Sequence, residues 1–166
     1  MNLKTFLIVG CIFSACAKKP PHVKSSSDST KSFVEVARQE FNLSPLGQGG
    51  SFSNNGVDAL YADFSFDGEV NEEEAKTLLF SVTDRFLNYA NSDRSLKPFL
   101  NIYPLSMSQM SVSIAFLDKN KNPRSTLAQI HLFDGKIFYS HYDKEKKAYI
   151  AYRNEAFPLA YSLRVE

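Results

Sequence analysis

Oxygen-bearing side chains recur between residues 63 and 74 at a spacing that could hold a metal ion. Counted from the first of them, they occupy positions 1, 3, 5, 9 and 12, with a glycine at position 6. The five candidate ligands are Asp63, Ser65, Asp67, Asn71 and Glu74. Ca²⁺ takes carboxylate and other oxygen ligands, and a glycine permits the sharp turn that wraps a loop around the ion. The segment is therefore a candidate calcium site.

In this spacing, residues 63–74 resemble the calcium loop of an EF-hand, and the resemblance implies a calcium-binding module. Two positions depart from the pattern, because Phe66 is bulky and apolar at the fourth place and Ala75 replaces the apolar anchor after the last ligand. The residues before the loop alternate between apolar and polar, which is typical of a strand rather than a helix. These departures favour an alternative, in which a strand leads into a helix capped by the Asn71 and Glu74 pair.

The histidines do not form a catalytic set. His22 lies near the N-terminus, and His131 and His141 flank Asp134-Gly135, a strong signal for a two-residue hairpin turn. In the hairpin register that this turn predicts, His131 and His141 lie on opposite faces, so they cannot share a metal ion or act together on one substrate. No serine stands in a nucleophile elbow. We predict no enzyme, with a hydrolase whose site escapes recognition as an alternative.

The same hairpin predicts an aromatic face that a simple two-layer fold would leave to solvent. The turn pairs Phe133 with Lys136 and Ile130 with Tyr139. The outward face then carries Gln129, His131, Phe133, Phe138, Ser140 and Tyr142, and its candidate contact residues are His131, Phe133, Phe138 and Tyr142. Exposed aromatic patches mark contact sites, so this face is a candidate docking site for a protein, a peptide or a glycan. The alternative is that a terminal helix or the crossover at residues 91–107 covers it.

The first sixteen residues have the layout of a secretory signal. A basic head containing Lys4 precedes the apolar run 5–13, which is shorter than the ~20 residues that span a bilayer. The small residues before Cys16 resemble the lipobox of bacterial lipoproteins. That resemblance implies cleavage after residue 15, a lipid anchor on Cys16, and a place at the outer membrane or cell envelope, on its periplasmic or surface side. Modification at Cys11, an ordinary cleaved signal and an uncleaved anchor are the alternatives.

The composition of the chain predicts three consecutive segments. Residues 1–15 are the predicted signal peptide, and residues 16–32 are predicted to form the lipidated cysteine and a disordered tether, because they are rich in Lys, Ser and Pro. Residues 33–166 are predicted to form a single domain.

Within the domain, the fold class is predicted as α+β, a two-layer sandwich with a long helix on a mostly antiparallel sheet of about five strands. A short helix is expected from Phe33 and a loop at 44–56. The longest helix is expected at 71–90, where an apolar stripe follows the capping pair. The expected strands are 57–66, 110–117, 126–133, 136–142 and 149–152, with a terminal helix at 154–165.

Charge and cysteine content exclude several function classes. Nineteen Lys and Arg against eighteen Asp and Glu give a formal net charge of +1, which argues against a nucleic-acid binder. Two cysteines cannot form a disulfide scaffold. We predict an envelope lipoprotein that binds or assembles with a partner without doing chemistry and needs no cofactor. The alternatives are the calcium-binding module and the hydrolase.

Overall fold

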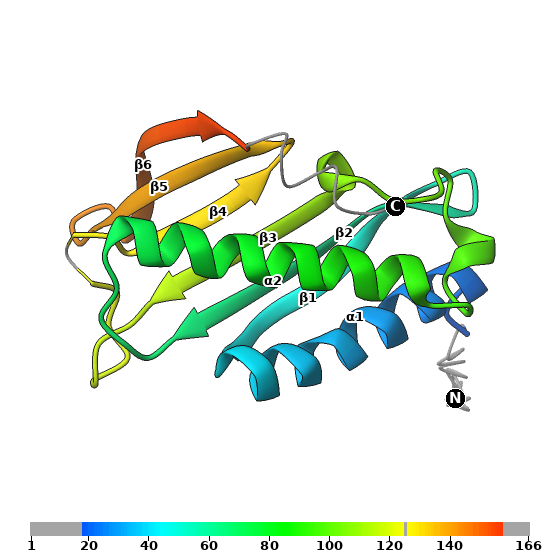
Figure 1. The fold of residues 1–166 in the computed structure, drawn as a ribbon, viewed down its shortest axis with the longest axis horizontal. Helices are drawn as coiled ribbons and strands as arrows, with labels where there is room; N and C mark the ends of the chain where they lie inside the picture. Colours follow the sequence, from blue (N-terminus) through cyan, green and yellow to red (C-terminus); the bar gives the residue numbers. More distant parts are fainter. Residues whose placement is uncertain (1–17, 125, 158–166) are drawn as a thin grey trace, which may run out of the picture.

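The computed structural model describes residues 18–124 and 126–157, and within them two helices pack on a six-stranded sheet (Figure 1). The helices are α1 (Pro21–Phe41) and α2 (Glu72–Ser92). The strands are β1 (Ser44–Ser53), β2 (Gly56–Phe66), β3 (Met110–Phe116), β4 (Gln129–Phe133), β5 (Lys136–Asp143) and β6 (Ala148–Ala156). Short 3-10 helices, η1 (Lys97–Phe99) and η2 (Met107–Gln109), lie between α2 and β3. The α+β prediction is confirmed, with six strands rather than about five.

The strands lie in the sheet in chain order, from β1 at one edge to β6 at the other. Neighbours are antiparallel except β2 and β3, which run parallel because α2 carries the chain back across the sheet between them. In the β4–β5 hairpin, Phe133 pairs with Lys136 and Ile130 with Tyr139, which confirms the predicted register. The turn residues Asp134 and Gly135 both have positive φ, as a tight hairpin turn requires.

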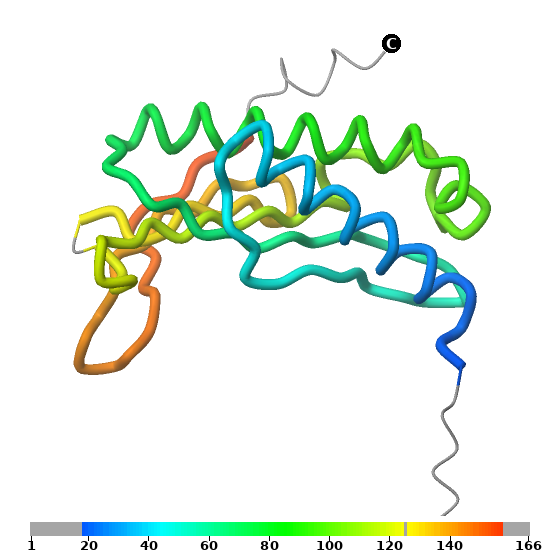
Figure 2. Tube along the Cα trace, turned by 90° about the horizontal axis from the view of Figure 1, so that it is seen from below, coloured from blue at the N-terminus to red at the C-terminus, as the bar shows by residue number. Residues whose placement is uncertain are grey.

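Both helices lie on the same side of the sheet (Figure 2). We call the covered side the inner face and the opposite side the open face. The inner face is apolar, and Phe33 of α1 stacks on Phe86 of α2 at 4.3 Å between ring centroids and contacts Phe64 of β2 edge-on. No described helix covers the open face, so the core lies on one side of the sheet and the described helices leave the other side uncovered.

The start of α2 is confirmed by its cap. The backbone N–H of Glu74 donates to Asn71 Oδ1 and the backbone N–H of Asn71 donates to Glu74 Oε2, both at 2.9 Å. Three glutamates occupy the first turn, where negative charge is favourable to the helix dipole. The helix extends to Ser92, two residues beyond the predicted end.

The predicted tether is wrong from Pro21 onward, because α1 begins there rather than at Phe33. Small polar side chains replace apolar ones on the packed side of its first three turns, and Thr30 Oγ1 donates to the carbonyl of Ser26 at 2.9 Å. Both residues are buried. Small side chains allow close packing and can return their hydroxyls to the helix backbone, so this part of the helix lacks the apolar stripe that identifies a helix in sequence.

The predicted loop at 44–56 is also wrong, because residues 44–53 form β1. Its glycines reflect close packing rather than a loop: a Cβ at Gly49 would lie 2.5 Å from the hydroxyl oxygen of Tyr61, which covers it from β2. Asn54 and Asn55 make the turn, both with positive φ.

The C-terminal strand is longer than predicted. β6 runs from Ala148 to Ala156, so residues 154–156 belong to a strand rather than to the predicted terminal helix. Phe157 follows the strand and is not helical, and residues 158–165 of that predicted helix lie outside the described residues.

Candidate functional site

The open face carries aromatic and hydroxyl side chains and few charges. From β2 to β5 it is formed by residues that alternate with the buried core residues and pair across the strands. They are Ala59, Tyr61, Asp63, Ser65, Ser111, Ser113, Ala115, Gln129, His131, Phe133, Lys136, Phe138, Ser140 and Tyr142. Asp63 and Lys136 are the acidic and basic residues of this set. A central sheet surface with so little charge resembles the core of a protein interface.

The four residues predicted to form a partner face all lie on this open face. Phe133 is 57% exposed, and His131, Phe138 and Tyr142 are half-buried by their neighbours. The rings of Phe133 and Phe138 lie 6.0 and 6.3 Å from the imidazole of His131, so these three side chains form one cluster. The crossover 91–107 begins in α2 and continues through η1 and η2, and within the described residues neither strand of the hairpin forms a backbone hydrogen bond with it. Most of the predicted terminal helix, the other element expected to cover this face, lies outside the described residues.

His131 is hydrogen-bonded to a serine on the neighbouring strand. Ser111 Oγ lies 3.0 Å from His131 Nε2. Burial lowers the pKa of His131, so the imidazole is neutral at neutral pH and offers one nitrogen as donor and the other as acceptor.

Asp63 lies on the same face and has no such partner. It forms no hydrogen bond or ion pair with another described residue, and burial raises the pKa of its carboxyl despite the opposing attraction of His131. Asp63 pairs with Ser113 and Ser113 with His131, so the carboxylate and the imidazole stand two strands apart. Two strand spacings separate their backbones by ~10 Å. The carboxylate therefore does not orient the imidazole, and Ser111, His131 and Asp63 do not form the linked triad of a hydrolase.

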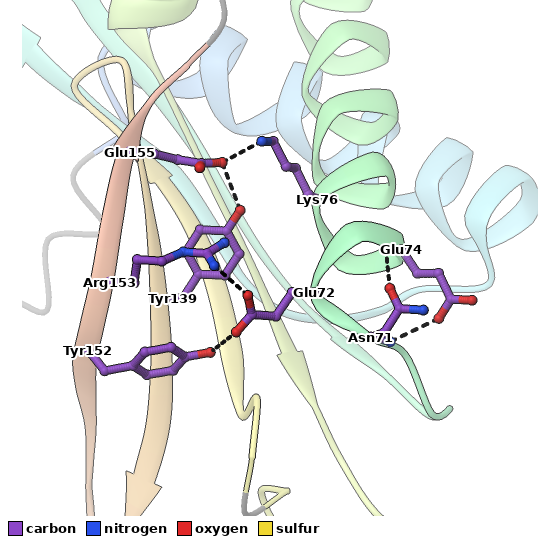
Figure 3. Close-up of polar contacts among 8 residues, drawn as sticks. All are labelled: Asn71, Glu72, Glu74, Lys76, Tyr139, Tyr152, Arg153 and Glu155. Carbon is purple, nitrogen blue, oxygen red and sulfur yellow. Dashed lines mark hydrogen bonds and ion pairs between the residues drawn. The ribbon is translucent and has the colours of Figure 1, made fainter.

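On the inner face, by contrast with Asp63 on the open face, the charged side chains are paired, as Figure 3 shows. Near the start of α2, six side chains form what we call the α2–β6 cluster: Glu72, Lys76, Tyr139, Tyr152, Arg153 and Glu155. Glu72 accepts from the Tyr152 hydroxyl at 2.7 Å and from Arg153 at 2.6 Å. Lys76 pairs with Glu155 at 2.6 Å. Every charge in the cluster has a partner of opposite sign.

The pKa values of the α2–β6 cluster follow from these contacts. Burial, followed by the hydrogen bond to Glu72, raises the pKa of Tyr152 to about 12. The contact with Lys76 lowers the pKa of Glu155. The Arg153 guanidinium lies 3.9 Å from the centroid of the buried Tyr139 ring, whose hydroxyl donates to Glu155. These contacts hold the β6 edge to α2, which is a structural role.

The candidate calcium ligands do not converge. Asp63 and Ser65 belong to β2, and Asn71 and Glu74 cap α2. Asp67 is ion-paired with Lys121. Within the described residues, no three His, Cys, Asp or Glu side chains are grouped so as to hold a metal ion. The structure has the alternative arrangement, a strand followed by a capped helix, because β-alternation before residue 67 prevents the helix that enters an EF-hand loop.

The other histidines lie apart from His131. His22 is in the first turn of α1, with its ring 5.5 Å from that of Phe52. His141 pairs with Ile150 and lies 6.1 Å from the Tyr152 ring.

The predicted signal and the lipidation residue Cys16 lie outside the described residues. No helix that the structure describes is long and apolar enough to cross a membrane.

The sequence did not predict the contact of Ser111 with His131, nor that Asp63 forms no hydrogen bond or ion pair with another described residue. The alternation of residues 110–116 places Ser111 on a polar face, but only the register brings it to His131.

Comparison with family models, with curated proteins and with solved structures finds no match for this chain. The function must therefore be argued from the geometry of the molecule.

Proposed function

We propose that the protein is a lipid-anchored protein of the bacterial cell envelope that docks a second envelope protein on the open face of its sheet, without catalysing a reaction. The observation that carries the docking proposal is that both helices pack on the inner face (Figure 2). This leaves the aromatic residues of β4 and β5 uncovered by either helix.

The chemistry of the open face favours a protein as the occupant. Phe133 and Phe138 present apolar rings, while Ser111 and Gln129 supply hydrogen-bonding groups between the strands. Interface cores are depleted in charge and enriched in aromatic residues, and this face shares both properties. The partner surface should therefore be apolar and hydrogen-bonding, with little net charge.

The dimensions of the open face also suit a protein partner. Six strands at ~4.8 Å spacing span ~24 Å, and a seven-residue strand is ~23 Å long. The flat area is on the order of 500 Å² before side-chain relief is added, which approaches the ~800 Å² that each partner buries in a standard interface.

The membrane anchor rests on the residues before Cys16, which resemble a lipobox. We expect protein isolated from membranes to begin at an acylated Cys16 when its N-terminal peptide is analysed by mass spectrometry. Cys16→Ala should release the protein from the membrane fraction, and Cys11→Ala should not. An unmodified N-terminus, or release by Cys11→Ala alone, would contradict the anchor.

Docking is tested by photocrosslinking in cells that express the full chain. A benzophenone amino acid at Phe133 or Tyr142 should crosslink to the same envelope protein, identified by mass spectrometry. The control position is Ile102, which is 56% exposed but lies in the crossover after α2. Phe138→Lys should abolish the crosslink, because it places a charge on the face of a folded protein.

Three results would contradict docking of a different envelope protein. They are a crosslink to a second copy of the chain, a crosslink to a glycan, and equal crosslinking from Ile102.

A further inference from the structure

A cavity opens at one end of the sheet, where the β3–β4 connection meets the β5–β6 turn. Its volume is about 690 Å³, within the ~300–1,000 Å³ range of small-molecule sites. We call it the basic cavity, and it is lined by Asp118, Asn122, Pro123, Arg124, Thr126, Tyr142, Lys144 and Lys147.

The charge of this lining is positive. Arg124, Lys144 and Lys147 face a single carboxylate, that of Asp118. The two lysines form no ion pair with another described residue, whereas Lys146, in the same turn, pairs with Asp143 at 3.5 Å. Two of the three cationic groups therefore have no counter-ion in the part of the chain that the structure describes.

The carboxylate of Asp118 is engaged in holding its own loop. Its Oδ1 accepts from the backbone N–H groups of Asn120 at 2.8 Å and Asn122 at 2.9 Å. These bonds lower the pKa of Asp118, so it stays ionised and fixes the turn. An anion entering the cavity therefore meets a preformed loop.

Arg124 is anchored beside the cavity but is not fully satisfied. Its backbone N–H donates to the carbonyl of Phe116 at 3.1 Å, and its Nη1 donates to Glu69 at 3.2 Å. Its Nε is buried and has no hydrogen-bond partner among the described residues. Arg124 also lines the basic cavity, and an oxyanion is the group that a guanidinium binds best.

We infer that the basic cavity binds a phosphate-bearing ligand, with Arg124 as the directional donor and Lys144 and Lys147 as point charges. Three cations suit a group with more than one negative charge better than they suit a single carboxylate. The side chains of Asn122, Thr126 and Tyr142 offer hydrogen bonds to the rest of the ligand.

The phosphate could belong to a soluble molecule or to a lipid headgroup, and the fold favours the soluble source. The two loops of the cavity lie at the end of the molecule opposite the start of α1 (Figure 1). A 21-residue helix is ~31 Å long. With a membrane anchor ahead of α1, as proposed, the cavity would be on the side away from that bilayer, although ligand binding itself does not require the anchor or the docking partner.

Isothermal titration of the full chain with inorganic pyrophosphate tests the inference. We expect saturable binding that Arg124→Gln weakens about tenfold, since a charge-assisted hydrogen bond is lost. The double variant Lys144→Gln/Lys147→Gln should weaken it by at least as much, and its exposed positions avoid the risk that loss of Arg124 disturbs the loop. Lys146→Gln is the matched control, because it removes one charge from the same turn without lining the cavity.

Vesicles containing phosphatidylglycerol provide the second arm. If pyrophosphate binds and the vesicles bind no more to the wild type than to the double variant, the ligand is soluble. Vesicle binding that is lost in the double variant would identify the phosphate as a headgroup. Absence of pyrophosphate binding, or equal weakening by Lys146→Gln, would overturn the inference, because the cavity would then contribute no more than diffuse positive charge.

Discussion

The two faces of the sheet differ in how their charged groups are paired. On the inner face, Lys76 and Glu155 pair with each other and Glu72 binds two partners from β6. On the open face, Asp63 has no hydrogen bond or ion pair with a described residue, although burial raises the pKa of its carboxyl. Groups that stabilise a fold are satisfied within it, whereas perturbed and unpaired groups cluster at functional sites. The difference separates the structural cluster from the proposed docking face.

The largest expected contrast is between neighbouring residues of β5 that point to opposite faces. Tyr139 is fully buried and Phe138 is half-buried on the open face. Tyr139→Ala should lower the free energy of unfolding by about 3–5 kcal/mol, the usual effect of truncating a buried aromatic residue. Phe138→Ala should cost less than about 1.5 kcal/mol. Urea denaturation measures both, and equal losses would show that the open face is packed like a core.

Substitution of Glu72 should lower both the stability of the fold and the pKa of Tyr152. Glu72→Gln should destabilise the fold by about 1 kcal/mol, because a charged acceptor is lost from a half-exposed site. It should also move the pKa of Tyr152 down from about 12, since the carboxylate disfavours the phenolate. NMR of ¹³C-labelled tyrosines follows that titration. Glu73→Gln, in the same helical turn, is the control that should leave the Tyr152 pKa unchanged.

Removal of the Asp63 charge should stabilise the protein. Because burial raises the carboxyl pKa in the folded state, stability falls as the pH rises from the unfolded-state pKa to the folded-state pKa, and the full cost remains at higher pH. Asp63→Asn should therefore raise stability by about 0.5–1 kcal/mol at pH 7. The gain should vanish below the unfolded-state pKa of about 3.9, where both forms are neutral. Thermal melting at both pH values measures it, with exposed Asp28→Asn as control.

The smallest expected effect is a pH dependence from His131. Burial lowers its pKa, so below the unfolded-state value of about 6.5 the unfolded chain binds a proton that the folded chain does not. Stability should then fall by less than about 1 kcal/mol between pH 7 and pH 5 on this account. His131→Gln should reduce that slope, and His22→Gln should retain it. An unchanged slope in His131→Gln would mean that the imidazole is not desolvated.

Elements whose stability is local were predictable from sequence. The apolar stripe and the Asn71–Glu74 pair locate α2 to within two residues, and Asp134-Gly135 sets the β4–β5 register. The first half of α1 was not predictable, because it packs through small polar side chains that resemble those of a disordered segment. The glycines of β1 were misread for a related reason, since the ring that requires them comes from another strand.

The candidate sites were predictable only in part. Alternation placed the aromatic residues of the hairpin on one face, but a strand pattern does not specify which face the helices will cover. The basic cavity combines turns that lie some twenty residues apart in the chain. Each of these turns was recognisable by itself, and their meeting depends on the register of three strands.

With a lipid on Cys16, as proposed, the early start of α1 would limit the distance between the domain and the bilayer. Five residue-to-residue steps separate Cys16 from Pro21, and a fully extended chain of that length covers at most ~18 Å. A lipid at Cys16 would therefore keep the start of α1 within this distance of the membrane surface. Any partner of the open face would have to present its surface close to the membrane, because the domain could not search deeper into the envelope.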